Sequence, residues 1–66
     1  MIENQALTAR LLELRQEHRD LDTAIEALAL TPRSDQLQLQ RLKKKRLRLR
    51  DEIARIEDQL YPDIIA

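Results

Sequence analysis

Hydrophobic residues recur along the chain at alternating intervals of three and four positions, first over residues 7–28 and again over residues 39–60. This spacing places them on one face of an α-helix and is typical of a coiled-coil seam. Each seam has one polar member, His18 in the first and Arg46 in the second. The seams comprise Leu7, Leu11, Leu14, His18, Leu21, Ile25 and Leu28, and then Leu39, Leu42, Arg46, Leu49, Ile53, Ile56 and Leu60. The pattern predicts two amphipathic helices.

The segment LTPRSD, residues 30–35, separates the two seams. Pro32 disfavours helical geometry at Thr31, and either Thr31 or Asp35 can cap the following helix, with Gln38 at capping-box spacing from Asp35. Pro62 ends the second helix, because proline cannot continue the hydrogen-bond ladder. We expect an all-α fold in a single domain, residues 1–66, with a helix at about 4–29, a connection at about 30–34, a helix at about 35–60 and a C-terminal tail at 61–66.

A short connection makes the helices antiparallel neighbours, so the numbers of facing residues add up to about 64. This register puts His18 opposite Arg46, so the two polar interruptions meet in one layer. The flanking charges support the register, with Arg15 beside Arg50 as the exception. Three flanking pairs have opposite signs: Asp22 with Lys43, Glu17 with Lys45, and Arg10 with Glu52. The fold class is therefore an antiparallel two-helix coiled-coil hairpin.

The composition agrees with this fold and limits its stability. The chain has no glycine and few β-branched residues, as expected for long helices. It has no cysteine, so neither a disulfide nor a thiolate metal site supports the core. Two helices cover only one stripe of each other, so we expect the hairpin to self-associate. Leu12, Leu47 and Ala54 lie off the seams and are candidates for a second contact surface.

Two segments, HRDLDTAI at residues 18–25 and RLKKKRLRLRDEI at residues 41–53, resemble the YdcH family of small bacterial proteins. Members carry His-x-x-Leu-Asp-x-x-Ile in the first half and an Arg-Leu-Lys-Lys-x-Lys-Leu-x-Leu-Lys-Asp-Glu-Ile type segment in the second. Arg46 and Arg50 stand where members commonly have lysine. The matching residues are His18, Leu21, Asp22, Ile25, Arg41, Leu42, Lys43, Lys44, Leu47, Leu49, Asp51, Glu52 and Ile53. The resemblance implies a helical hairpin of unknown function, without an established activity, cofactor or catalytic residue.

The polar seam layer of His18, Arg46 and Asp22 is the first candidate site. An imidazole titrates near neutral pH, so His18 has an interpretation as general base, pH switch or metal ligand. We favour a structural role, in which the layer fixes helix register and oligomeric state. Neutral His18 can accept a hydrogen bond from Arg46, and Asp22 is the carboxylate expected to assist. Arg46 should reach water or a partner chain, so we expect two hairpins to associate around this layer.

The basic run at residues 41–50 is the second candidate site, with seven Lys and Arg side chains. Phosphate binding by such a run would weaken steeply with salt. Helical geometry spreads these charges around the helix, and no aromatic residue interleaves with them to stack on bases. We therefore favour a solvated helix face, with nucleic acid as the alternative partner. The candidate anion-binding face is Arg41, Lys44, Arg48, Arg50 and Arg15.

The function classes that remain are those of an interaction protein. The sequence offers no glycine-rich phosphate loop and no cysteine nucleophile, and Ser34 has no histidine near it in the expected hairpin, so we predict no catalytic, metal or cofactor site. Acids and bases balance, and no run approaches the roughly 20 apolar residues of a membrane span. We expect a cytoplasmic, non-enzymatic module for protein–protein association that does not bind membranes, forms homo-oligomers and binds an unidentified client. The tail PDIIA, residues 62–66, either frays or packs on a partner.

Overall fold

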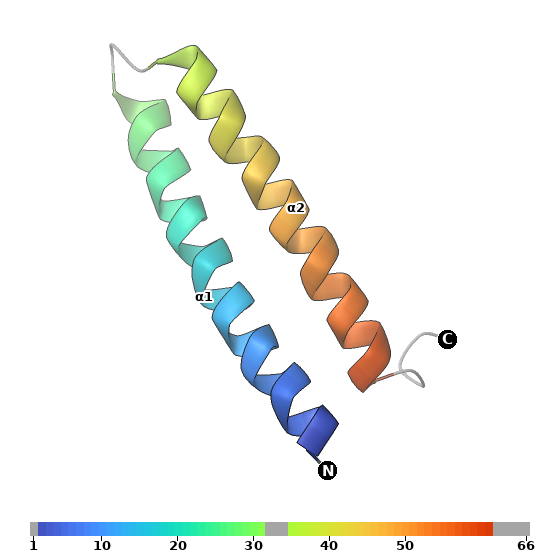
Figure 1. Cartoon of the computed structure of the whole chain (residues 1–66). Coiled ribbons are helices and arrows are strands. Elements are labelled where there is room, and N and C mark those ends of the chain that lie inside the picture. The colour runs from blue at the N-terminus through green and yellow to red at the C-terminus, as the bar shows by residue number, and fades with distance from the viewer. Residues whose placement is uncertain (1, 32–34, 62–66) are drawn as a thin grey trace.

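The computed structural model describes residues 2–31 and 35–61, with side chains described from Asn4 onwards. Two helices, α1 over Ile2–Leu30 and α2 over Gln36–Leu60, lie side by side and run antiparallel (Figure 1). The molecule is elongated, with extents of 49 × 24 × 14 Å. The predicted all-α antiparallel hairpin is confirmed.

Asp35 is the N-cap of α2. Its backbone is extended, and its Oδ1 accepts hydrogen bonds from the backbone N–H groups of Leu37 and Gln38 at 2.9 and 3.4 Å. Thr31, the other candidate cap, instead belongs to the end of α1, where its hydroxyl donates to the carbonyl of Ala27 at 2.8 Å. Leu30, expected in the connection, is the last residue of α1. The remainder of the predicted connection, residues 32–34, and the tail residues 62–66 lie outside the described residues.

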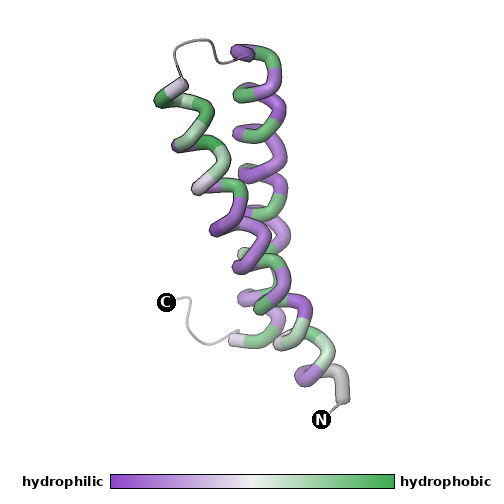
Figure 2. The backbone as a smooth tube through the Cα atoms, turned by 90° about the vertical axis from the view of Figure 1, so that its left-hand side faces the viewer, coloured by the Kyte–Doolittle hydropathy of each residue, from purple (hydrophilic) through white to green (hydrophobic). Residues whose placement is uncertain are grey.

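The core is the predicted seam. Each of its leucine and isoleucine side chains is buried or half-buried. Figure 2 shows apolar positions recurring along both helices, which are inclined to each other. The buried core residues are Leu11, Leu14, Ile25, Leu39, Leu49 and Ile56. Because burial of such a side chain stabilises by about 1.5–3 kcal/mol, this single row holds the hairpin together.

The flanking ion pairs show where the predicted register is right. Arg10 Nη2 donates to Glu52 Oε1 at 3.3 Å, as the register predicts. Among the described side chains, no ion pair joins Glu17 to Lys45.

On the other side of the seam, the ion pairs are formed with partners other than the predicted neighbours. Arg15 bonds to Glu57 at 2.8 Å, and Asp22 bonds to Arg46 at 2.8 Å rather than to Lys43. Side chains on a helix lean toward its N-terminus. In an antiparallel pair, this lean carries Arg15 toward the C-terminal end of α2 and Arg46 toward the C-terminal end of α1. The predicted register was based on axial position alone, so it did not include this displacement of the side-chain ends.

The buried seam predicts that two nearby leucines of α1 differ sharply in their contribution to the free energy of unfolding. Leu14 is fully buried, whereas Leu12 is 61% exposed. Leu14→Ala should lower the free energy of unfolding by about 2–5 kcal/mol, because it leaves a cavity in the row. The control Leu12→Ala should change it by about 0.5 kcal/mol or less in a dilute monomer. Urea denaturation followed by circular dichroism measures both, and equal losses would contradict the described core.

Candidate functional site

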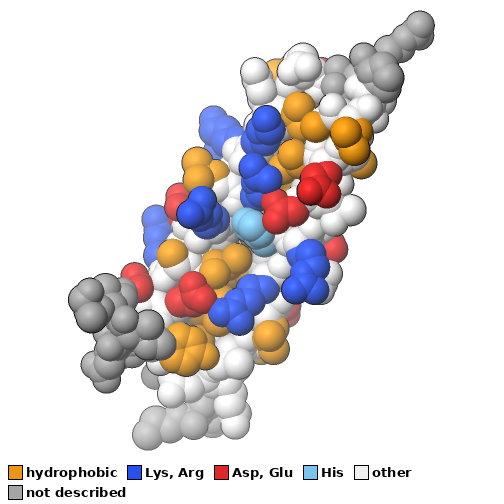
Figure 3. Space-filling view, turned by 180° about the vertical axis from the view of Figure 1, so that it is seen from behind, with side chains coloured by type: hydrophobic (Ala, Val, Ile, Leu, Met, Phe, Trp, Pro, Cys, Tyr) orange, Lys and Arg blue, Asp and Glu red, His pale blue; other side chains and the backbone are white. Residues whose placement is uncertain are grey.

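An open groove of about 760 Å³ runs between α1 and α2 on one side of the hairpin. Figure 3 shows this side, where Lys and Arg side chains gather around the single histidine. Five cationic side chains line the groove, together with two apolar ones. We call it the basic groove, and its residues are Arg15, His18, Arg19 and Asp22 of α1 and Lys43, Arg46, Leu47, Arg50 and Ile53 of α2.

Asp22 joins the two polar members of the seams. Its Oδ1 accepts a hydrogen bond from Arg46 Nη1 at 2.8 Å, and its Oδ2 lies 3.4 Å from His18 Nδ1. His18 and Asp22 are one helical turn apart on α1, so both reach the same place. The structure therefore brings together the three residues of the predicted polar layer. Among the described side chains, His18 and Arg46 share no direct hydrogen bond, because Asp22 takes that position.

The polar layer is in contact with solvent. The side chains of His18, Asp22 and Arg46 are 28%, 46% and 36% exposed. Arg46 is thus partly covered at its seam position, and its guanidinium bonds to Asp22 at the groove, as expected for a long basic side chain. Charge is neutralised locally by one carboxylate, and no buried side-chain polar atom in the described part of the chain lacks a partner. The layer interrupts the core without burying an unpaired charge.

The layer is poorly suited to bind a metal ion. Within the described residues, no group of three or more histidine, aspartate or glutamate side chains could hold one. His18 and Asp22 supply two potential ligands, but the next group in the layer is the guanidinium of Arg46. The positive charge of this guanidinium, whose Nη1 lies 2.8 Å from Asp22 Oδ1, opposes the binding of a cation.

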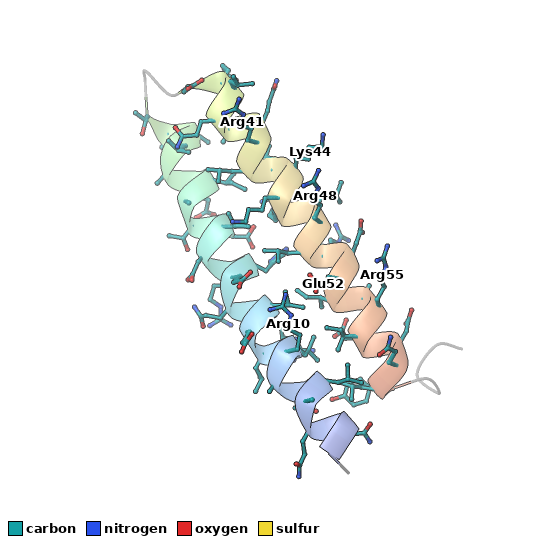
Figure 4. All side chains as sticks on the ribbon, viewed as in Figure 1. Arg10, Arg41, Lys44, Arg48, Glu52 and Arg55 are labelled. Carbon is teal, nitrogen blue, oxygen red and sulfur yellow. The ribbon has the colours of Figure 1, made fainter. Side chains whose placement is uncertain are left out.

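The candidate anion-binding face is divided by the fold. Arg41, Lys44 and Arg48 follow one another along α2 at spacings of three and four residues, and Arg55 lies one heptad further on (Figure 4). We call these four residues the outer stripe. Arg50 and Arg15 instead line the basic groove. The five predicted residues therefore belong to two surfaces.

Sequence reasoning missed Arg19, Arg55 and the place of Lys43 in the groove. Arg19 lies one turn after Arg15 and one turn before Asp22, a spacing that puts all three on one side of α1. The sequence therefore contained the information needed to place these three residues together. The residues that α2 contributes to the groove could not be predicted in the same way, because they depend on how α2 is rotated about its axis. Arg55 could have been found by extending the spacing of Arg41 and Arg48 by one heptad.

The ion pairs leave the basic groove positively charged. Glu57 neutralises Arg15, and Asp22 neutralises Arg46. Among the described residues, no ion pair is formed by the remaining three cations of the groove, Arg19, Lys43 and Arg50. The groove therefore combines uncompensated positive charge with apolar surface.

Away from the groove, Arg10 contacts acids on both helices. Its guanidinium lies 3.3 Å from a carboxylate oxygen of Glu52 of α2 and 3.2 Å from one of Glu13 of α1. Figure 4 labels Arg10 and Glu52 on the two facing helices. The hydrogen bond to Glu52, and then that to Glu13, raises the pKa of the Arg10 guanidinium above its ordinary value. Both carboxylates therefore favour the charged form of Arg10.

The polar layer yields a stability prediction. Changing His18→Leu together with Arg46→Leu should raise the free energy of unfolding by about 1 kcal/mol and the thermal midpoint by about 4–8 °C, because apolar packing replaces partly desolvated charge. Asp22 remains half-exposed and solvated in this variant. Thermal circular dichroism measures the midpoint, and sedimentation should show a broader range of assemblies. An unfolded double variant would show that the two residues do more than form a polar layer.

A family model described as "Protein of unknown function (DUF465)" matches residues 11–57. This span contains every residue of the basic groove. No curated protein and no solved structure matches the chain significantly.

In the described part of the chain, neither helix combines the length and the apolar character that crossing a membrane requires.

Proposed function

The chain belongs to the DUF465 family of proteins of unknown function, and we propose that it is a non-enzymatic module that acts by associating with other protein chains. The observation that carries this proposal is the exposure of large apolar side chains on a hairpin with a single-row core. Leu12 is 61% exposed and Leu47 is 56% exposed. Covering such side chains with a partner removes apolar surface from water and so favours association.

Self-association is part of this proposal, and the separation of Leu12 from Leu47 supports a contact surface other than the one expected from the sequence. Leu12 lines a shallow depression on α1 with Ala9, whereas Leu47 lines the basic groove, so they do not form one surface. Two grooves placed face to face would also bring like charges together. We therefore assign self-association to the Leu12 side of α1 rather than to the polar layer.

The proposal includes a cytoplasmic location and a YdcH-like identity. The support for the latter is the pair of segments at 18–25 and 41–53, which lie in α1 and α2 and fall inside the span matched by the family model. These segments also supply the polar layer, so the resemblance and the layer concern the same residues.

Self-association can be measured by sedimentation at micromolar concentration. We expect a mass above that of one chain, falling toward it on dilution, because partner chains cover Leu12. Leu12→Glu should shift the equilibrium toward the monomer by about tenfold or more, since a charge would enter an apolar contact. The control Leu37→Glu changes a leucine of α2 that is 54% exposed and should leave the mass unchanged. A folded wild-type monomer at every concentration would contradict this part of the proposal.

Nucleic-acid binding is the second candidate, because the outer stripe aligns four cations along α2 (Figure 4). Among the described residues, none of these four forms an ion pair. Phosphates could therefore approach this side of α2 without competing with a carboxylate already paired to it.

Fluorescence anisotropy with duplex DNA and with RNA, each at two salt concentrations, separates the two candidates. If the module acts on proteins, binding at low salt should be undetectable. Binding that falls with salt and disappears in the variant with Arg41→Glu, Lys44→Glu and Arg48→Glu would establish the nucleic-acid function instead. Circular dichroism of the variant checks that the hairpin remains folded.

A further inference from the structure

The basic groove has the form of an incomplete helix bundle. Its two walls are α1 and α2, and Leu47 and Ile53 supply apolar surface between them. Leu47 is 56% exposed, although the nearby seam residue Leu49 is buried. A third helix, about 10–12 Å across with its side chains, can lie along two antiparallel helices and cover this surface.

The charges of the groove select the chemistry of such a helix. Arg19 stands on the α1 wall, and Lys43 and Arg50 stand on the α2 wall. Because the ion pairs among the described residues leave these three cations uncompensated, a partner with acids on both flanks of its apolar row would neutralise both walls. We propose that the basic groove binds an amphipathic helix of another protein, with leucine-like residues against Leu47 and Ile53 and acidic residues toward Arg19, Lys43 and Arg50. This inference rests on the proposed function and names its partner.

Two other occupants fit the groove less well. A second copy of the same groove would set cations against cations. A nucleic acid would place phosphates near the carboxylate of Asp22 and leave the apolar surface of Leu47 without a base-stacking aromatic side chain among the groove residues. A helix avoids both problems, because it presents apolar side chains to the centre of the groove and carboxylates to its rims.

The test uses two fluorescent three-heptad peptides that differ only in their flanks. Both carry leucine on the seam, and one carries glutamate and the other lysine at the flanking positions. Two double variants of the full chain are compared: Lys43→Glu with Arg50→Glu in the groove, and Lys44→Glu with Arg48→Glu in the outer stripe. Each changes one lysine and one arginine of α2, so the total charge change is matched.

We expect the glutamate peptide to bind the wild type, to bind the groove variant about tenfold or more weakly, and to bind the outer-stripe variant within about twofold of wild type. The lysine peptide should bind the groove variant better than the wild type, because the charge preference is reversed. Circular dichroism and sedimentation of both variants check that the fold and the assembly are retained.

Three results would overturn the proposal: no binding of the glutamate peptide, equal weakening by both double variants, or tighter binding of an RNA oligonucleotide that is lost in the groove variant. The first would reject an acidic helix, the second would show a diffuse charge effect, and the third would assign the groove to nucleic acid. Wild-type self-association is measured separately. If it persists while the peptide fails, only the groove assignment falls, and the proposed association function stands.

Discussion

The row of leucine and isoleucine side chains between α1 and α2 is the interaction on which the rest of this hairpin depends. Each helix offers the other a single stripe, and six side chains are buried along it. A row this narrow has two edges, so side chains beside it are neither in a core nor fully in water. The groove, the flanking ion pairs and the half-exposed polar layer are all consequences of those open edges.

Asp22 shows how one flanking residue can control such an edge. It lies beside the seam on α1, yet its two oxygens face groups from both helices. By accepting from Arg46, it allows a guanidinium to occupy a seam position without an unpaired charge, which would be expensive in apolar surroundings. The same contact joins α1 to α2 on that side of the seam. The carboxylate of Asp22 therefore takes part both in the contact between the helices and in the local neutralisation of charge.

The sequence predicted the fold because seam spacing, capping and helix breaking act over a few residues. The alternating spacing identified the buried row, and Asp35 was correctly among the two candidate caps. The flanking contacts were harder to predict, because they depend on the lean and length of side chains as well as on axial position. Arg15 reached Glu57, and the candidate anion-binding face separated into two surfaces. A helical wheel gives the direction in which each side chain leaves its own helix. The shape of a groove between two helices also depends on how the helices are placed relative to each other.

The unequal distribution of charge around the seam has a consequence for diffusion. The chain has no formal net charge at neutral pH, so it is neither drawn to nor repelled by a charged body at long range. Most of its unpaired cations among the described residues nevertheless lie in two separate places, the basic groove and the outer stripe. A charged partner close to either place therefore meets local positive charge, although the chain as a whole is neutral. Salt at 0.1 M screens these local interactions beyond about 10 Å, so they act on the orientation of a partner only at short range.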